Sequence, residues 1–400
     1  MTNIDQHQDA RSYRLSNIDM LRGLVIVIMA IDHVRDGFMM GAVHDVMDQP
    51  DVTLSLYLTR WITHFCAPVF VFLAGTSAGL MAARKTPQAL GAFLLKRGLW
   101  LIFVEIFIIA NLVSFSPFGV AEMGGAIIVV LQVIWAIGAS MVLLGAAQFM
   151  GGKRCLYLGV VILLGHNVLD PLWVGASEES ASPWLALLFY QHSFGLGPFA
   201  IWEIYPVLAW FGVMLLGFGS AFIFEQESQV RDAQLRRIGM IFIAVFVILR
   251  TVGLYGDANG WEVQEYGLVV TVLDFMNVTK YPPSLLFLLA TLGPMAIVAG
   301  LADRFNGWLK DTLVMFGRVP FLFYLAHFLL IHLLAIALGV LQGFDASQFM
   351  TAFMFYPEGY GVSLPGVYAA WLLVLVILYP LCKWFAGVKT RSRSWWLSYL

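Results

Sequence analysis

Long apolar runs alternate with short polar segments along almost the whole chain. A helix that crosses lipid needs roughly 20 mostly apolar residues, because about 30 Å of hydrocarbon is crossed at about 1.5 Å per residue. A transmembrane barrel would instead show alternating segments of about ten residues. The runs predict membrane-spanning helices near residues 20–41, 61–82, 98–117, 126–149, 155–175, 204–224, 238–255, 283–302, 313–340 and 366–386.

The predicted fold class is therefore all-α, a polytopic transmembrane bundle of about ten helices. Residues 1–19 form a polar segment before the first run, residues 20–386 a single helical domain, and residues 387–400 a basic tail. The polar start carries both acids and arginines, unlike the short basic start of a cleavable signal peptide. The first run is thus expected to be a retained anchor.

Composition strengthens the membrane interpretation. Hydrophobic residues make up 60% of the 400 residues and charged residues 12%, a balance outside that of a soluble domain. The main expected partner is the lipid bilayer, and no basic face suggests a nucleic acid. Cys66, Cys155 and Cys382 lie in separate apolar segments without metal-ligand spacing, so neither a disulfide framework nor a metal site is predicted.

Lysines and arginines are distributed unequally between alternate loops, which predicts an orientation. Placing both chain ends in the cytoplasm puts most basic residues there, including Arg84, Lys85, Lys153, Arg154, Arg236, Arg237, Lys389 and Arg391. Arg35, Arg60, Arg250 and Lys280 then fall toward the outer face. We expect a multi-pass protein of a bacterial inner membrane, and a homodimer is compatible with the sequence.

Ionisable residues inside apolar spans are costly, so each is a functional candidate. The densest group lies at the outer end of the first span, in "AIDHVRDGF", with Asp32, His33, Arg35 and Asp36. Asp32 and Asp36 share one helix face, and Arg35 is three residues from Asp32. The group is either a structural ion-pair network or the acid and base of a site, because imidazole accepts protons near neutral pH.

Further polar residues lie near the same predicted face. Arg60 and His64 are four residues apart at the start of the second span. A lone histidine there is more often a hydrogen-bonded helix-end residue, but two histidines from adjacent spans, His33 and His64, strengthen the case for catalysis. The remaining candidates for lining a substrate site are His44, His166, Arg250, Lys280, Tyr324 and His327. At the inner face, Asp19 and Arg22 are expected to pair, while the loop around Arg236 or the pair Lys153–Arg154 could meet the phosphates of a nucleotide.

The run "NIDMLRGLVIVIMAIDHVRD" followed by "RWITHFCAPVFVFLAGTSAGL" resembles bacterial membrane proteins related to the catalytic domain of heparan-α-glucosaminide N-acetyltransferase. Later blocks such as "GHNVLD", "YPPSLLF" and "FGRVPFLFYLAHFLLIH" extend the likeness over nearly the whole chain. In the eukaryotic enzymes an Asn and a His eleven residues on are implicated in catalysis. Without gaps, His33 stands at the Asn position and His44 at the His position.

The resemblance implies a transmembrane acyltransferase. Acetyl-CoA or another acyl-CoA would serve as co-substrate from the cytoplasm, and the acyl group would pass to an amine or hydroxyl of a sugar or glycan on the other face. Our hypothesis is that His33, oriented by Asp32 or Asp36, takes the proton of the acceptor, while His64 and Arg60 stabilise the oxyanion. Direct transfer and an acyl-histidine intermediate both remain open.

Two other functions fit the same residues. A proton-coupled transporter or flippase of a sugar or anionic small molecule would use Asp32, His33, His327 and Arg250 during alternating access. A purely structural membrane subunit is disfavoured by the number of intramembrane polar groups. Stabilisation by CoA compounds would distinguish the enzyme from the transporter.

Overall fold

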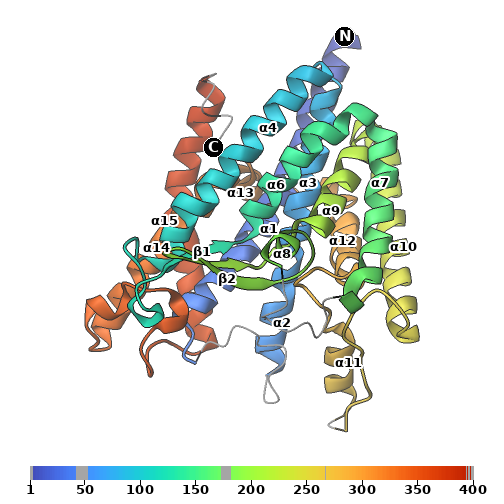
Figure 1. Ribbon diagram of the computed structural model, residues 1–400. Coiled ribbons are helices and arrows are strands. Elements are labelled where there is room, and N and C mark those ends of the chain that lie inside the picture. The colour runs from blue at the N-terminus through green and yellow to red at the C-terminus, as the bar shows by residue number, and fades with distance from the viewer. Residues whose placement is uncertain are drawn as a thin grey trace.

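The computed structural model describes residues 3–41, 53–172, 182–265 and 267–392, together with residues 394 and 397. Within these ranges long helices form a bundle, and a small sheet runs crosswise to them (Figure 1). The helices are α1 (Asn3–Phe38), α2 (Leu54–Ile62), α3 (Cys66–Ala82), α4 (Pro87–Val104), α5 (Ala110–Ser114), α6 (Val133–Ala147), α7 (Gly152–Gly165), α8 (Pro183–Phe189), α9 (Val207–Gly219), α10 (Ser228–Val252), α11 (Leu268–Met276), α12 (Leu285–Ala299), α13 (Trp308–Arg318), α14 (Pro320–Leu341) and α15 (Leu364–Arg391).

Several of these helices join end to end into longer rods. A single 3-10 turn, Thr63–Phe65, links α2 to α3, and a π-helical segment, Glu105–Ile109, links α4 to α5. In the described part of the chain, five such helical stretches are long and apolar enough to cross a membrane. They are Leu54–Ala82, Val133–Met150, Val207–Glu225, Pro320–Leu341 and Leu364–Arg391. The count of about ten crossings stays a prediction.

The two ends of the bundle are distinguished by the positions of the chain ends and of the sheet. α1 begins and α15 ends at the same end, which we call the basic end (Figure 1). The sheet lies toward the opposite end, where α1 finishes at Phe38, and we call this the sheet end. α1 runs from Asn3 through the first apolar run, so most of the predicted polar segment 1–19 belongs to the same helix as the first span.

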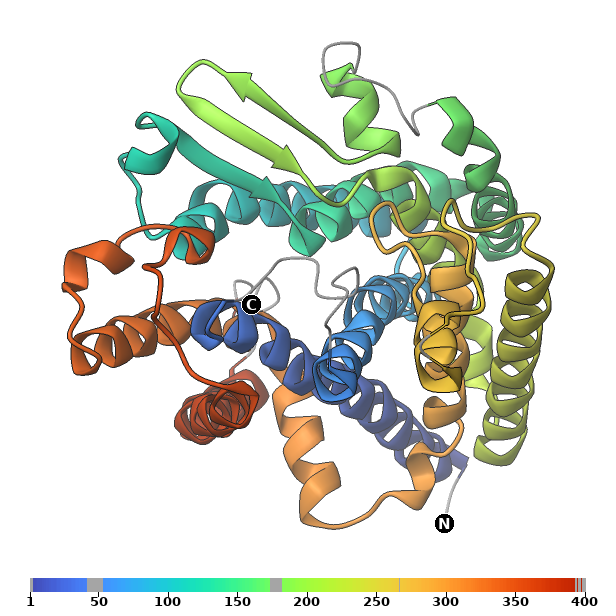
Figure 2. The same ribbon diagram turned by 90° about the horizontal axis from the view of Figure 1, so that it is seen from below.

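A three-stranded sheet was missed by the all-α prediction. Its order is β1–β3–β2, with β1 (Ile127–Leu131) parallel to β3 (Phe199–Glu203) and β2 (His192–Leu196) antiparallel to β3. Seen from the sheet end, the hairpin of β2 and β3 lies at the edge of the bundle beside β1 (Figure 2). The predicted helix 126–149 is wrong at its start, since β1 occupies its first residues and α6 begins at Val133.

α1 and α13 approach each other closely through two glycines. A Cβ atom at Gly317 would overlap the backbone carbonyl of Asp19, and one at Gly23 would overlap the carbonyl of Leu313. Backbones can come this close when no side chain stands between them. The contact fixes the middle of α1 against α13, between Asp19 and Arg22 on one side and the polar residues near Phe38 on the other.

This contact gives a first prediction. Gly317→Ala should lower the free energy of unfolding by roughly 1–3 kcal/mol, because the added methyl group forces two packed backbones apart. The measurement is the thermal unfolding midpoint of the detergent-purified protein. Gly152→Ala at the start of α7 is the matched control, since a Cβ there meets nothing within 4 Å. Equal midpoints for the two variants would contradict the close α1–α13 contact.

Candidate functional site

Two cavities of similar size lie inside the helical bundle. The sheet-end cavity, about 430 Å³, is lined by residues of α1, the segment from α2 to α3, β3 and α14. The basic-end cavity, about 420 Å³, is lined by residues of α1, α3, α4, α6, α13 and α15. Four residues are common to the linings of the two cavities: Met29, Phe70, Val133 and Tyr324. The two cavities are therefore neighbours inside the protein and share this set of side chains, which we call the junction.

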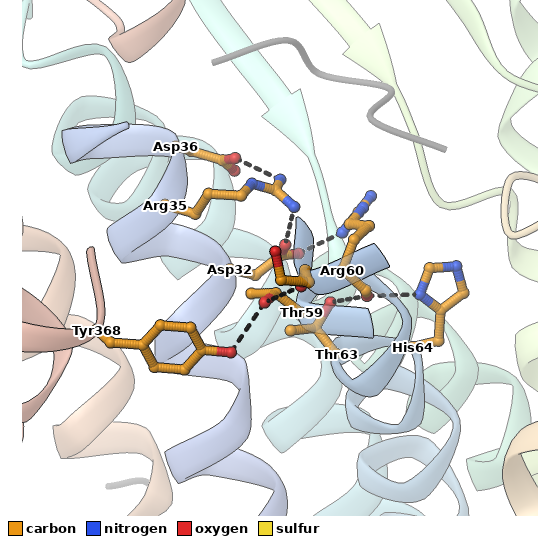
Figure 3. Close-up of polar contacts among 9 residues, drawn as sticks. Asp32, Arg35, Asp36, Thr59, Arg60, Thr63, His64 and Tyr368 are labelled. Atoms are coloured by element: carbon orange, nitrogen blue, oxygen red, sulfur yellow. Dashed lines mark hydrogen bonds and ion pairs between the residues drawn. The ribbon is translucent and has the colours of Figure 1, made fainter. Parts of the chain in front are cut away.

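The charged groups predicted in the first span form one compact ion-pair network at the sheet-end cavity (Figure 3). Arg35 bridges Asp32 at 3.1 Å and Asp36 at 2.6 Å, and Arg60 from α2 pairs with the second oxygen of Asp32. The Arg35 side chain is 1% exposed. Two buried guanidinium groups thus balance two carboxylates, which is how charges persist inside an apolar bundle.

His33 lies beside this network but bonds to a different helix. Its Nδ1 is 2.7 Å from Nε2 of His327 on α14, 294 residues away in the chain. The ring of Phe328 stacks on His33 with centroids 4.5 Å apart. The aspartates of α1 are engaged by arginines, so the predicted orientation of His33 by Asp32 or Asp36 is corrected: the direct hydrogen-bond partner is His327.

The surroundings of His327 fix which nitrogen of His33 carries a proton. His327 is fully buried, and its Nδ1 lies within hydrogen-bond distance of the backbone carbonyls of Phe323 and Tyr324. A carbonyl oxygen only accepts hydrogen bonds, so this Nδ1 is protonated. Burial favours the neutral ring, whose Nε2 then accepts from Nδ1 of His33. Nε2 of His33 is left with a free lone pair, and His33 lines the cavity.

Hydroxyl groups and one cation complete the sheet-end cavity. Tyr205 and Tyr281 face each other with their hydroxyl oxygens 3.3 Å apart. The Lys280 ammonium lies 4.9 Å from the centre of the Tyr281 ring, and Lys280 lines the cavity. The tyrosines were missed, because Tyr281 lies between two predicted spans and Tyr205 lies at the very start of another, each directly before a proline.

Basic residues surround the other cavity. Arg22, Arg97, Arg318 and Lys389 line the basic-end cavity, together with one acid, Asp19. Asp19 accepts from Arg22 at 3.0 Å, which confirms the predicted pair, and Arg22 also donates to Ser77. Arg318 is about half exposed. The predicted phosphate contacts at Lys153–Arg154 and Arg236 lie outside the lining of this cavity.

Three predicted site residues lie elsewhere. The buried ring of His64 bonds through Nδ1 to the carbonyl of Arg60 at 3.0 Å and lies against Phe287, pointing away from Asp32 (Figure 3). His166 bonds to the carbonyl of Pro283 at 2.9 Å and ties the end of α7 to the segment before α12. His64 and His166 do not line the sheet-end cavity. The third, His44, lies outside the described residues.

Arg250 contacts backbone carbonyls and lines neither cavity. Its guanidinium is 2% exposed and donates to five backbone carbonyls, those of Asn259, Gly260, Asp274, Phe275 and Asn277. These carbonyls belong to the segment around α11. With its donors used in this way, Arg250 organises that segment, and the predicted substrate contact is corrected.

A comparison with models of known protein families shows where this chain belongs. Residues 14–253, more than half of the chain, match the family model described as heparan-alpha-glucosaminide N-acetyltransferase, catalytic. The chain belongs to this family. A search of curated proteins finds no match. The family region contains His33, the ion-pair network and Arg22 and Arg97 of the basic-end cavity. His327, Tyr324, Arg318 and Lys389 follow it in the chain.

Membership of the heparan-α-glucosaminide N-acetyltransferase catalytic family makes this chain a membrane protein of an acyltransferase family. The described residues contain no group of three His, Cys, Asp or Glu side chains placed to hold a metal ion. The expectation that no metal takes part stays a prediction. The polar side chains that line the two cavities are the reactive groups that the chain itself supplies.

A buried carboxyl beside the sheet-end cavity gives a prediction on pH. Glu203 is the last residue of β3 and is 1% exposed, next to the cavity-lining Trp202 and Ile204. Burial raises its pKa from the ordinary 4.5 to about 9, more than the nearby Trp135 indole lowers it. The unfolded chain therefore loses this proton near pH 4.5, while the folded protein keeps it up to about pH 9.

Between pH 4.5 and about pH 9 the unfolded state binds fewer protons than the folded state. The buried Glu203 carboxyl therefore makes the free energy of unfolding fall as pH rises through this range. Glu203→Gln keeps the shape and stays neutral. Relative to the parent protein, the variant should gain stability progressively from about pH 5 to about pH 9. Thermal unfolding midpoints across this range check it, and parallel pH profiles for the two proteins would contradict the buried neutral carboxyl.

Proposed function

We propose that this protein transfers an acyl group from an acyl-CoA bound in the basic-end cavity to an amine or hydroxyl acceptor bound in the sheet-end cavity. The single observation that supports this most strongly is the junction, the four side chains that line both cavities within the bundle. A thioester that reaches the junction from one side lies beside an acceptor that enters from the other. Holding two reactants in contact supplies much of the rate of such a reaction.

The basic-end cavity suits the polyanionic end of acyl-CoA. Its lining carries four cationic side chains against the single carboxylate of Asp19. Guanidinium and ammonium groups are the usual partners of phosphate in proteins. Apolar residues of the same lining, such as Ile134 and Ile137, lie on α6 beside the junction residue Val133 and offer an uncharged path for the pantetheine arm.

The sheet-end cavity supplies the base. His33 keeps an unprotonated Nε2 because its Nδ1 donates to His327. This nitrogen takes the proton of the acceptor as the nitrogen or oxygen of the acceptor attacks the thioester carbon. The carbon–sulfur bond then breaks, and the proton leaves with the thiol of CoA. The acceptor is a sugar or glycan, with Lys280 and the Tyr205–Tyr281 hydroxyl pair available for contacts.

The orientation follows the distribution of basic residues. The positive-inside rule places the basic end in the cytoplasm, where acyl-CoA is made, and the sheet end on the outer face. The membrane would then be a bacterial inner membrane, with acyl groups delivered across it. Asp32 and Arg60 hold α1 against α2 beside the acceptor and keep His33 in register with α14.

Binding of the donor tests the basic-end cavity. Acetyl-CoA and CoA should each raise the thermal unfolding midpoint of the purified protein, since a ligand of the folded state stabilises it. Arg318→Gln should weaken acetyl-CoA binding by roughly tenfold, about 1.4 kcal/mol, through loss of a phosphate contact. Arg237→Gln, an exposed arginine of α10 outside both cavities, should bind as the parent does.

The transporter is the outcome that would replace this proposal. Its signature is the absence of any CoA or acetyl-CoA effect on stability, together with proton-coupled uptake of a sugar into liposomes. Equal acetyl-CoA affinities for Arg318→Gln and Arg237→Gln would remove the donor from the basic-end cavity.

Substitution of the histidine pair tests the base. With acetyl-CoA as donor and glucosamine as the probe acceptor, His33→Ala should lower the transfer rate by roughly 10²–10⁴-fold, the usual worth of a general base. His327→Phe keeps the aromatic stacking but removes the acceptor of the His33 proton. It should lower the rate less and change the pH dependence of kcat.

His192→Ala on β2 is the control for this pair, since His192 lies outside both cavities. Its rate should equal that of the parent. Full activity of His33→Ala would exclude His33 as the base, and an unchanged pH profile of His327→Phe would exclude its positioning by His327.

A further inference from the structure

Tyr324 occupies a special place between the two cavities. It lies in the second turn of α14, is 4% exposed, and is one of the four residues that line both cavities. The other three, Met29, Phe70 and Val133, have apolar side chains. The Tyr324 side chain therefore carries the polar group of the junction.

The hydroxyl of Tyr324 has no hydrogen-bond partner in the part of the chain that the structure describes. A buried hydroxyl without a partner is unfavourable, and native proteins usually satisfy such groups. The two other tyrosines of the sheet-end cavity follow this rule, because the hydroxyls of Tyr205 and Tyr281 face each other. An unsatisfied donor at the junction points to a partner that arrives with the substrate.

Tyr324 is also coupled to the proposed base through the backbone. Its own carbonyl accepts from Nδ1 of His327, the residue that holds His33. The ring centroids of Tyr324 and His33 lie 6.3 Å apart at 75° to each other. One turn of α14 thus sets the spacing between the base and the free hydroxyl.

We propose that the Tyr324 hydroxyl donates a hydrogen bond to the carbonyl oxygen of the acyl thioester and stabilises the oxyanion that forms there. This inference rests on the proposed acyl transfer. As the acceptor attacks, the new bond to carbon forms, the carbonyl electron pair moves onto oxygen, and the acceptor proton passes to Nε2 of His33. When the tetrahedral intermediate collapses, the carbon–sulfur bond breaks and the thiolate of CoA takes that proton.

The groups expected from the sequence are less well placed for this role. Arg60 is held by Asp32 and His64 lies outside the sheet-end cavity. Lys280 lines the sheet-end cavity but not the basic-end cavity from which the thioester comes. A donor aimed at the site of developing charge contributes most when it is already in place and shielded from water, as Tyr324 is.

Tyr324→Phe tests the inference by removing one oxygen atom. In acetyl-CoA transfer to glucosamine, kcat should fall by roughly 10²–10³-fold, as when an oxyanion donor is removed. The KM for acetyl-CoA and the thermal stabilisation by acetyl-CoA should change by less than about twofold. Tyr356→Phe is the matched control, because its hydroxyl is likewise buried and unpartnered among the described residues but outside both cavities.

A spectroscopic readout separates this role from a structural one. Acetyl-CoA labelled with ¹³C at the thioester carbonyl should show a lowered carbonyl stretching frequency when bound to the parent protein or to Tyr356→Phe. In Tyr324→Phe the carbonyl stretching frequency should rise toward its value in a solvent that donates no hydrogen bonds. An unchanged frequency, or an unchanged kcat, would overturn the inference.

The outcomes also separate this inference from the proposed function. A parent protein that transfers acetyl groups while Tyr324→Phe is equally active overturns the role of Tyr324 alone. A parent protein that neither binds acetyl-CoA nor transfers its acetyl group overturns the proposed function and this inference together. Loss of acetyl-CoA binding in Tyr324→Phe would assign the hydroxyl to binding and also contradict the inference.

Discussion

A polar group inside an apolar helical bundle has to be paired with another polar group, and most of this structure follows from that constraint. Asp32 pairs with two arginines, and His33 is hydrogen-bonded to His327. Arg250 donates to five backbone carbonyls. Each of these pairings joins segments that are distant in the chain or stabilises a loop at the sheet end. The polar groups therefore determine how the helices fit together as much as the apolar surfaces do.

The same constraint separates structural polar residues from those available for chemistry. Arg250 and His166 have their donors directed at backbone oxygens, and both stand apart from the cavities. His33 keeps one free nitrogen and Tyr324 one free hydroxyl, and both line the sheet-end cavity. Both residues therefore keep hydrogen-bonding capacity for a substrate in or beside the junction, where the proposed reaction between a donor and an acceptor would take place.

Local sequence spacing predicted much of the helical framework and some of its contacts. The apolar runs indicated a helical membrane protein, and the three-residue spacing predicted the pairs Asp19–Arg22 and Asp32–Arg35. β1 was missed because its residues, "IIVVL", continue directly into the apolar helix α6. Periodicity cannot distinguish a short buried strand from a helix in such a run.

Contacts between distant segments could not be predicted from spacing. His33 and His327 are 294 residues apart, and the likeness of sequence blocks says nothing about which histidines touch. Likewise, the basic side chains of the basic-end cavity come from α1, α4, α13 and α15, so no local basic cluster in the sequence marks them. The basic residues at Lys153–Arg154 and around Arg236, offered by the sequence as possible phosphate contacts, are equally expected from the positive-inside rule.

The protonation of His33 is the most direct test of the account, because the proposed chemistry depends on which nitrogen is free. Solid-state NMR of the protein labelled with ¹⁵N-histidine in lipid bilayers, assigned with His33→Ala, distinguishes the two neutral tautomers. The account predicts that His33 is neutral with the proton on Nδ1 and a bare Nε2, and that His327→Phe abolishes this preference. A His33 signal with the proton on Nε2, or a charged ring near neutral pH, would contradict it.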